Sequence, residues 1–164
     1  MKQQLFKAIF ICSIVLLLSG CRTTSIVTPN NMRYEIECAG NGVQGTYLLK
    51  VWVYGSEKSI DLDYIKHCAV HGVIFKGFAG GNGCPSQKPM ASSPALEQQR
   101  NEFFTPFFGT DKAYRVYASE VGGGLDRVKV GKELKIGAVI SVSKDMLRRD
   151  LEAAGIIRGL NTGF

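Results

Sequence analysis

Residues 34–54, YEIECAGNGVQGTYLLKVWVY, are the stretch that decides the fold. Their two ends, residues 34–39 and 46–54, are rich in β-branched and aromatic side chains, which favour strands. Residues 40–45 between them supply three glycines and an asparagine, the residue types that tight turns need. Two such segments joined by such a loop predict a β-hairpin.

A helix and a further strand are expected directly after the hairpin. Ser59 or Asp61 can cap a helix that runs to about His71. Residues 73–78 are apolar and short, which predicts a buried strand. Residues 77–93 are dense in Gly, Pro and Ser and are typical of a loop.

The second half of the chain continues the alternation. Ser93-Pro94 is a strong helix start, with a cap residue before a proline at the first helical position. That helix should end before Pro106. Residues 113–121 and 134–142 predict two more strands, with Gly122-Gly123-Gly124 as a flexible break between them.

A last helix is expected from the cap residue Ser143 to a glycine stop at Gly155. The predicted order is ββαβαββα. It implies one α+β domain over residues 33–164, a two-layer arrangement of about three helices on a mixed or antiparallel sheet. The sequence shows no internal repeat.

The N-terminus has the order of a secretory signal. Lys2 and Lys7 supply positive charge, and residues 8–18 are apolar but too few for a spanning helix of about 20 residues. The following Leu18-Ser19-Gly20-Cys21 resembles the lipobox of bacterial lipoproteins. That resemblance implies removal of residues 1–20 and a lipidated Cys21. The alternative is a plain signal peptide with an incidental cysteine.

Residues 21–32 contain Ser, Thr, Pro and Asn with few large apolar groups, so they predict a flexible tether. In the lipoproteins that the motif resembles, Asp beside the lipidated cysteine tends to retain the protein in the inner membrane. Here Arg22 follows Cys21. We therefore expect a lipid anchor at Cys21 in the outer membrane, with the domain on the periplasmic face, because diacyl anchoring is stable.

The charge of the chain argues against nucleic acid as a partner. Residues 1–20 carry two of the 20 basic side chains and none of the 14 acidic ones, so the mature chain would carry +4. That balance is too weak for a nucleic-acid footprint. Basic residues that could face anionic headgroups or an acidic partner, or form a solvated surface, are Arg127, Lys129, Lys132, Lys135, Lys144, Arg148 and Arg149.

Three cysteines remain once Cys12 leaves with the signal and Cys21 carries lipid. An odd number leaves one unpaired, and we expect no obligatory disulfide. Cys38 and Cys68 lie in apolar segments and fit as small buried hydrophobes. Cys84 lies in the glycine-rich loop and is the most exposed candidate.

Two constellations could carry catalysis. His67 and His71 are four residues apart on the predicted helix and share a face, so they could bind zinc with a cysteine. However, Cys68 stands where a metalloprotease helix has Glu. Cys84 could alternatively act as a nucleophile with His67 or His71 as its base.

Residues 40–45 match the Gly-x-Gly-x-x-Gly pattern of dinucleotide sites. That pattern needs a helix after its third glycine, whereas a strand is expected here, so these glycines serve a turn. We expect no cofactor, no metal ligand and no catalytic residue.

The sequence as a whole favours a non-catalytic binding or assembly component of a cell-envelope complex. Its expected partners are the lipid bilayer, through Cys21, and an envelope protein or a second copy of the chain. The alternative is a cysteine- or metal-dependent envelope enzyme that uses Cys84 with His67 or His71. Binding to a glycan such as peptidoglycan also fits the composition.

Overall fold

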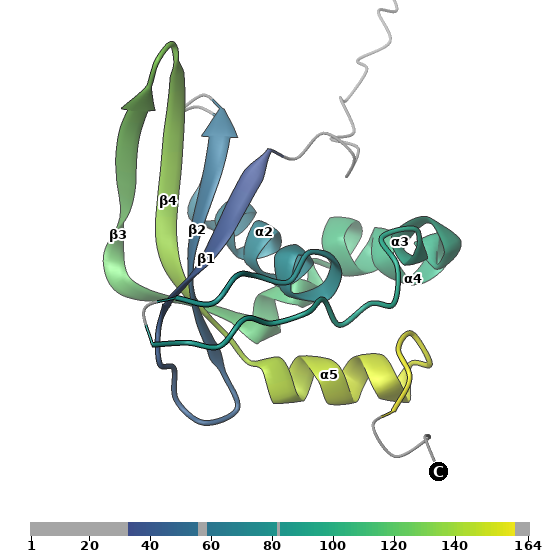
Figure 1. The fold of residues 1–164 in the computed structure, drawn as a ribbon. Coiled ribbons are helices and arrows are strands. Elements are labelled where there is room, and N and C mark those ends of the chain that lie inside the picture. Colours follow the sequence, from purple (N-terminus) through teal and green to yellow (C-terminus); the bar gives the residue numbers. More distant parts are fainter. Residues whose placement is uncertain (1–32, 56–58, 82, 160–164) are drawn as a thin grey trace, which may run out of the picture. The chain divides into compact units, whose positions relative to one another are not determined.

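A computed structural model describes residues 33–55, 59–81 and 83–159. The signal segment 1–20, the lipobox with Cys21 and the tether 21–32 lie outside the described residues. Figure 1 shows a sheet with helices packed against one of its faces, which is an α+β fold as expected.

The sheet has four antiparallel strands in the order β1-β2-β4-β3. They are β1 (Tyr34–Gly40), β2 (Tyr47–Gly55), β3 (Ala118–Val130) and β4 (Glu133–Val142). The first two form the predicted hairpin. Strand β2 also pairs with β4 in a regular antiparallel register that begins with Tyr47 opposite Val142. Glycines in the hairpin loop provide the left-handed backbone that the turn needs, for example at Gly45 with φ +82°.

The predicted break at Gly122-Gly123-Gly124 is wrong, because these residues lie inside β3. The strand accommodates them by a bulge: Val121 pairs with Val139, and the next pair is Asp126 with Gly137. Gly122 and Gly123 have φ values of +102° and +77°, which side chains rarely adopt. Glycine therefore allows the bulge while pairing resumes beyond it.

Helix α2 (Leu62–Phe75) begins at the predicted cap, where the Asp61 carboxylate accepts a hydrogen bond from the Tyr64 amide at 2.7 Å. The strand predicted over residues 73–78 is wrong, because the helix continues through Phe75. Residues 68–75 are all buried, and a helix buried all round gives the same unbroken apolar run as a buried strand. The helix ends at Phe75, and Gly77 with φ +67° follows just after its C-cap Lys76.

Two short helices, α3 (Leu96–Gln99) and α4 (Asn101–Thr105), follow the loop. Helix α4 ends at Thr105, directly before Pro106 as predicted, and a π-helical turn over Pro106–Thr110 follows it. The segment Ala113–Tyr117 is a 3₁₀ helix, so the strand predicted from residue 113 starts only at Ala118.

Helix α5 (Lys144–Ala153) follows Ser143 and is succeeded by Gly155 with φ +65°, as predicted. The structural order therefore has two strands, a helical region, two strands and a helix. The predicted order ββαβαββα was wrong in its third strand. No helix within the described ranges is both long enough and apolar enough to cross a bilayer.

The core lies between the sheet and α2. Alternate residues of β2 and β4 face it and are buried, among them Leu49, Val51, Ile136 and Ile140. Each such side chain contributes about 1.5–3 kcal/mol when it leaves water. Gly72 lets α2 approach strand β1 closely, since a Cβ on Gly72 would lie 2.6 Å from Cδ1 of Ile36.

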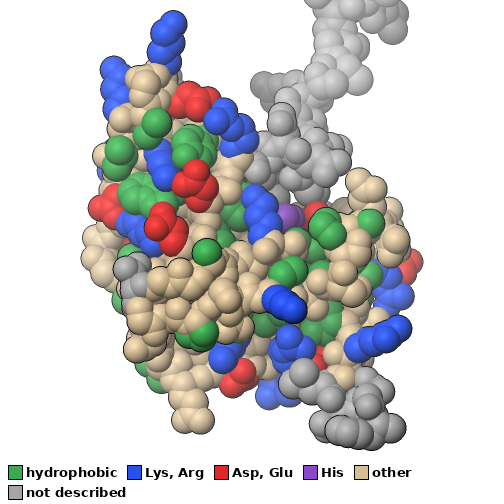
Figure 2. Space-filling model, viewed as in Figure 1, with side chains coloured by type: hydrophobic (Ala, Val, Ile, Leu, Met, Phe, Trp, Pro, Cys, Tyr) green, Lys and Arg blue, Asp and Glu red, His purple; other side chains and the backbone are tan. Residues whose placement is uncertain are grey.

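The opposite face of the sheet carries a mixture of side chains. Trp52 lies over Gly137, and the ammonium groups of Lys50 and Lys135 lie 4.5 and 5.1 Å from its ring centre. Lys135 also donates to Glu35 at 2.5 Å. Figure 2 shows hydrophobic side chains interspersed with basic and acidic ones over the strands. Cation–π contacts and ion pairs therefore cover much of this face.

Candidate functional site

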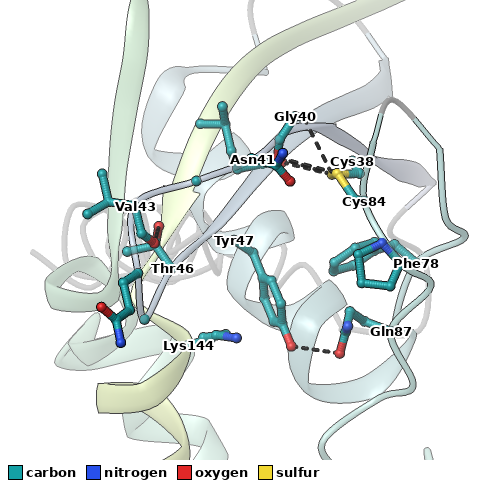
Figure 3. Close-up of a pocket in the computed structure, with 15 residues that line it drawn as sticks. Cys38, Gly40, Asn41, Val43, Thr46, Tyr47, Phe78, Cys84, Gln87 and Lys144 are labelled. Atoms are coloured by element: carbon teal, nitrogen blue, oxygen red, sulfur yellow. Dashed lines mark hydrogen bonds between the residues drawn. A yellow bond between two sulfur atoms is a disulfide. The ribbon is translucent and has the colours of Figure 1, made fainter.

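A pocket of about 290 Å³ lies where three segments far apart in the sequence meet. Its walls come from the β1–β2 loop (residues 40–46), from the loop after α2 (residues 78–87) and from Lys144 at the start of α5 (Figure 3). Tyr47, the first residue of β2, lies between them. The volume is at the lower end of the range of ligand pockets.

A disulfide between Cys38 and Cys84 joins two of these segments. The expectation of no obligatory disulfide was wrong. Cys38 faces inward from β1 beside the loop that carries Cys84, whereas the third cysteine, Cys68, is fully buried in α2. An odd count shows that one cysteine is left over, and only the fold decides which two meet.

The loop after α2 is ordered by backbone pairing as well. Phe78 and Gln87 exchange two backbone hydrogen bonds of 2.9 Å, and Gly81 and Cys84 exchange two of 3.1 and 2.9 Å. The loop is thus a narrow antiparallel ribbon that the disulfide attaches to β1. These constraints shape the pocket wall before any ligand arrives.

Tyr47 is held from two sides. Its hydroxyl donates to Oε1 of Gln87 at 2.8 Å, and its ring packs edge-to-face on Phe78 with 5.1 Å between ring centres. Burial raises the pKa of Tyr47, so the phenol stays protonated at neutral pH. Figure 3 shows this hydrogen bond on the inner wall of the pocket.

Lys144 supplies the charge of the site. It is the one charged side chain among the described residues that line the pocket, and its ammonium lies 4.9 Å from the centre of the Tyr47 ring. The next residue, Asp145, donates its backbone N–H to the Gly45 carbonyl at 3.3 Å. This bond docks the start of α5 onto the hairpin loop and positions Lys144.

The histidines lie in another part of the fold. His67 stacks on Phe108 with 4.7 Å between ring centres, and its Nε2 is buried without a hydrogen-bond partner among the described residues. Burial, together with the neighbouring His71, lowers the pKa of His67 to about 4. His67 thus packs as a half-buried ring among aromatic side chains.

His71 is part of a hydrogen-bonded chain between β1 and α3. Its Nδ1 lies 2.5 Å from the Tyr34 hydroxyl and its Nε2 lies 3.2 Å from Oε2 of Glu97. Tyr34 and Cys38 are four residues apart on β1, about 13 Å along a strand. The structure therefore does not join His71 to the Cys38–Cys84 disulfide.

Helix α2 carries the free thiol of Cys68 and the two histidines that were considered as zinc ligands. Burial raises the pKa of Cys68 to about 12, so it is a neutral thiol under ordinary conditions. Within residues 33–55, 59–81 and 83–159, no group of three or more His, Cys, Asp or Glu could hold a metal ion.

The sequence did not single out Tyr47 or Gln87, and it named Lys144 only as one of seven basic residues that could face an anionic partner. Lys144 did have a local signal, because it directly follows the helix cap Ser143 and so had to lie at a helix start. Tyr47 and Gln87 are 40 residues apart and had no such signal. Cys21, the predicted lipidation site, lies outside the described residues.

Comparisons of this chain with protein-family models, curated proteins and solved structures find no match. The residues and their geometry therefore carry the functional argument.

Proposed function

We propose that this chain is a lipid-anchored envelope protein whose α+β domain binds a partner in the pocket rather than catalysing a reaction. One observation carries the proposal. The pocket is shaped in advance by the Cys38–Cys84 disulfide and the Tyr47–Gln87 hydrogen bond, and Lys144 adds one positive charge to it. Preformed pockets of this kind bind ligands with little ordering cost.

Two features support an envelope location. Leu18-Ser19-Gly20-Cys21 resembles a lipobox, and residues 22–31 suit a tether. The disulfide adds an independent argument, because disulfides persist in oxidising compartments such as the periplasm and are rare in the cytosol. We place the protein on the periplasmic face of the outer membrane, held there by the lipid on Cys21.

The chemistry of the candidate groups supports binding. The Cys84 sulfur is bonded to Cys38 and offers no thiolate to attack a substrate. The phenol of Tyr47 is engaged with Gln87, and its pKa is raised. Apart from Tyr47, the described lining residues place no titratable acid or base beside Lys144, because Cys38 and Cys84 are joined in the disulfide. The enzyme alternative with His67 or His71 thus lacks an assembled set of residues.

The partner that suits this site is a segment of an envelope protein, or of a second copy of the chain. The pocket has room for a short piece of chain rather than a folded surface. Its mouth is accessible, with Val43 at the rim 80% exposed. Nucleic acid is not an expected partner.

Site-specific photo-crosslinking in intact bacterial cells tests the proposal. A photo-reactive residue replaces Val43 at the rim, and a matched chain carries it at Val116, which is 67% exposed and lies outside the pocket. We expect an adduct with an envelope protein, or a crosslinked dimer, from position 43 and not from position 116. Equal labelling from both positions, or none, would contradict binding at the pocket.

The anchor is tested in the same cells by mass spectrometry of the purified chain. We expect acyl chains on Cys21 and membrane fractionation, and we expect both to be lost in Cys21→Ser. An unacylated Cys21 in a processed chain would overturn the lipoprotein part of the proposal, whatever the crosslinking shows.

A further inference from the structure

The charge pattern around the pocket selects an anionic ligand. Lys144 has no ion-pair partner among the described residues, and its ammonium lies over the Tyr47 ring at the inner wall. Two further charges lie close on α5. The Asp145 carboxylate lies against Gly45, since a Cβ added to Gly45 would lie 3.0 Å from Oδ2 of Asp145. Arg148 forms an ion pair with Glu152 at 3.4 Å. Neither is among the lining residues, so the unpaired charge inside the pocket is positive.

The neutral lining adds hydrogen-bonding groups and an apolar wall. Oε1 of Gln87 accepts from Tyr47, which leaves the two amide hydrogens of Gln87 available to a ligand. Asn41 contributes a second side-chain amide at the loop. Phe78 and Pro85, with the disulfide, form an apolar surface beside these polar groups. Amide and apolar groups beside a cation match a peptide unit that ends in a carboxylate.

We infer that the pocket binds the free carboxylate at the end of a short peptide, with Lys144 pairing the carboxylate and Gln87 donating to the peptide group. Phosphate is less suited, because a phosphate ester carries more than one negative charge at neutral pH and this lining offers one ammonium. A carboxylate carries one charge and is matched by it. This inference rests on the proposed binding function and names its ligand class.

Two sources in the envelope share this chemistry: the C-terminus of a partner protein and the peptide stems of the cell wall. Both present a carboxylate on a short, flexible segment that can enter a small pocket. Lys144 and the Gln87 amide would recognise the terminal carboxylate and the peptide group that both sources share.

Isothermal titration of the full-length chain, purified in mild detergent, tests the inference. The probes are N-acetyl-Ala-Ala with a free carboxylate and the same peptide with a C-terminal amide. We expect the carboxylate form to bind and the amide form to be weaker by about tenfold or more, the loss expected of one charge-assisted hydrogen bond.

Variants assign the effect to Lys144. Lys144→Met should weaken carboxylate binding by about tenfold, whereas Lys144→Arg should retain most of it because the charge remains. Lys132→Met is the matched control, since Lys132 is exposed in the β3–β4 turn outside the pocket, and it should bind as the wild type does. Unchanged thermal unfolding of each variant shows that the fold is intact.

Co-sedimentation with isolated cell-wall sacculi separates the two sources. Sedimentation that requires Lys144 assigns the carboxylate to wall stem peptides, and peptide binding without sedimentation assigns it to a protein C-terminus. Equal affinity for the carboxylate and amide probes, full binding by Lys144→Met, or no binding at millimolar concentration would overturn the inference. Crosslinking from Val43 would still stand in each of these cases, so the two proposals can fail separately.

Discussion

Tyr34, His71 and Glu97 show how single polar residues are accommodated inside this domain. One assignment satisfies both bonds of the imidazole: the Tyr34 hydroxyl donates to Nδ1, and Nε2–H donates to the Glu97 carboxylate. Burial raises the pKa of Tyr34 and keeps its phenol protonated. These two hydrogen bonds tie β1, α2 and α3 together, and they leave neither ring nitrogen of His71 unpaired.

His67, four residues earlier on α2, is in the opposite situation and predicts acid sensitivity. Its pKa falls from an ordinary value near 6.5 to about 4 in the fold, so the folded state favours the neutral ring. The stability that this provides is complete above pH 6.5 and is lost as the pH falls toward 4. The loss at pH 5 should be on the order of 2 kcal/mol in the free energy of unfolding.

Urea unfolding at pH 7, 6 and 5 measures this effect, with His67→Phe as the comparison. The substitution keeps an aromatic ring against Phe108 and removes the titrating group. The variant should lose less stability than the wild type over this range, because all other titrating groups are shared. Parallel stability profiles for the two chains would show that His67 does not titrate as stated.

The loop between α2 and α3 differs most from what its sequence suggests. Its glycines suggest mobility, yet backbone pairs at Phe78–Gln87 and Gly81–Cys84 hold it as a ribbon. The disulfide attaches this ribbon to β1. Glycine here serves close approach: a Cβ on Gly77 would lie 2.2 Å from the Gln87 carbonyl oxygen.

Removal of the disulfide should destabilise the domain and loosen the pocket. The bond joins residues 46 positions apart, and closing a loop of that size restricts the unfolded chain, which is worth about 2–4 kcal/mol. Cys38→Ala/Cys84→Ala should therefore unfold at lower denaturant concentration than the oxidised wild type. Denaturant titration with and without a reducing agent makes the measurement.

The double variant also provides the internal control for reduction. A reducing agent should lower the midpoint of the wild type and leave that of the double variant unchanged. A wild type that responds no more than the variant would contradict a disulfide between Cys38 and Cys84.

At the scale of the whole molecule, one core joins the sheet to its helices. Buried side chains from β2, β4, α2 and α5 belong to a single hydrophobic cluster, with Leu147 and Leu151 as the contribution of α5. Such a core cannot lose one layer without exposing the other. We therefore expect one cooperative unfolding transition.

Two spectroscopic signals on the full-length chain test this cooperativity. Trp52 is the sole tryptophan of the chain and lies on the outer face of the sheet over Gly137, so its fluorescence follows the sheet. Far-ultraviolet circular dichroism follows mainly the helices. The two denaturation midpoints should coincide, and an earlier loss of helical signal would show that the helices unfold as a separate unit.

Some features of this protein follow from the sequence by local rules. The hairpin over residues 34–54 was predictable because β-branched and aromatic runs flank a glycine loop. Asp61 marked the start of α2 through its side-chain cap, and Ser143 and Gly155 flank α5. The lipobox interpretation of Cys21 also rests on sequence alone. All these signals act within a few residues of chain.

Other features depended on contacts that no local pattern encodes. Residues 73–75 belong to the part of α2 in which every residue from 68 to 75 is buried, and residues 122–124 stay in β3 because β4 pairs beyond the bulge. The pocket joins Tyr47 to Gln87 across 40 residues and adds Lys144 from α5. The sequence by itself thus determined the hairpin and the helix boundaries. The tertiary structure decided the disulfide and the binding site, because both require side chains that meet only when the sheet, loop and helix are packed together.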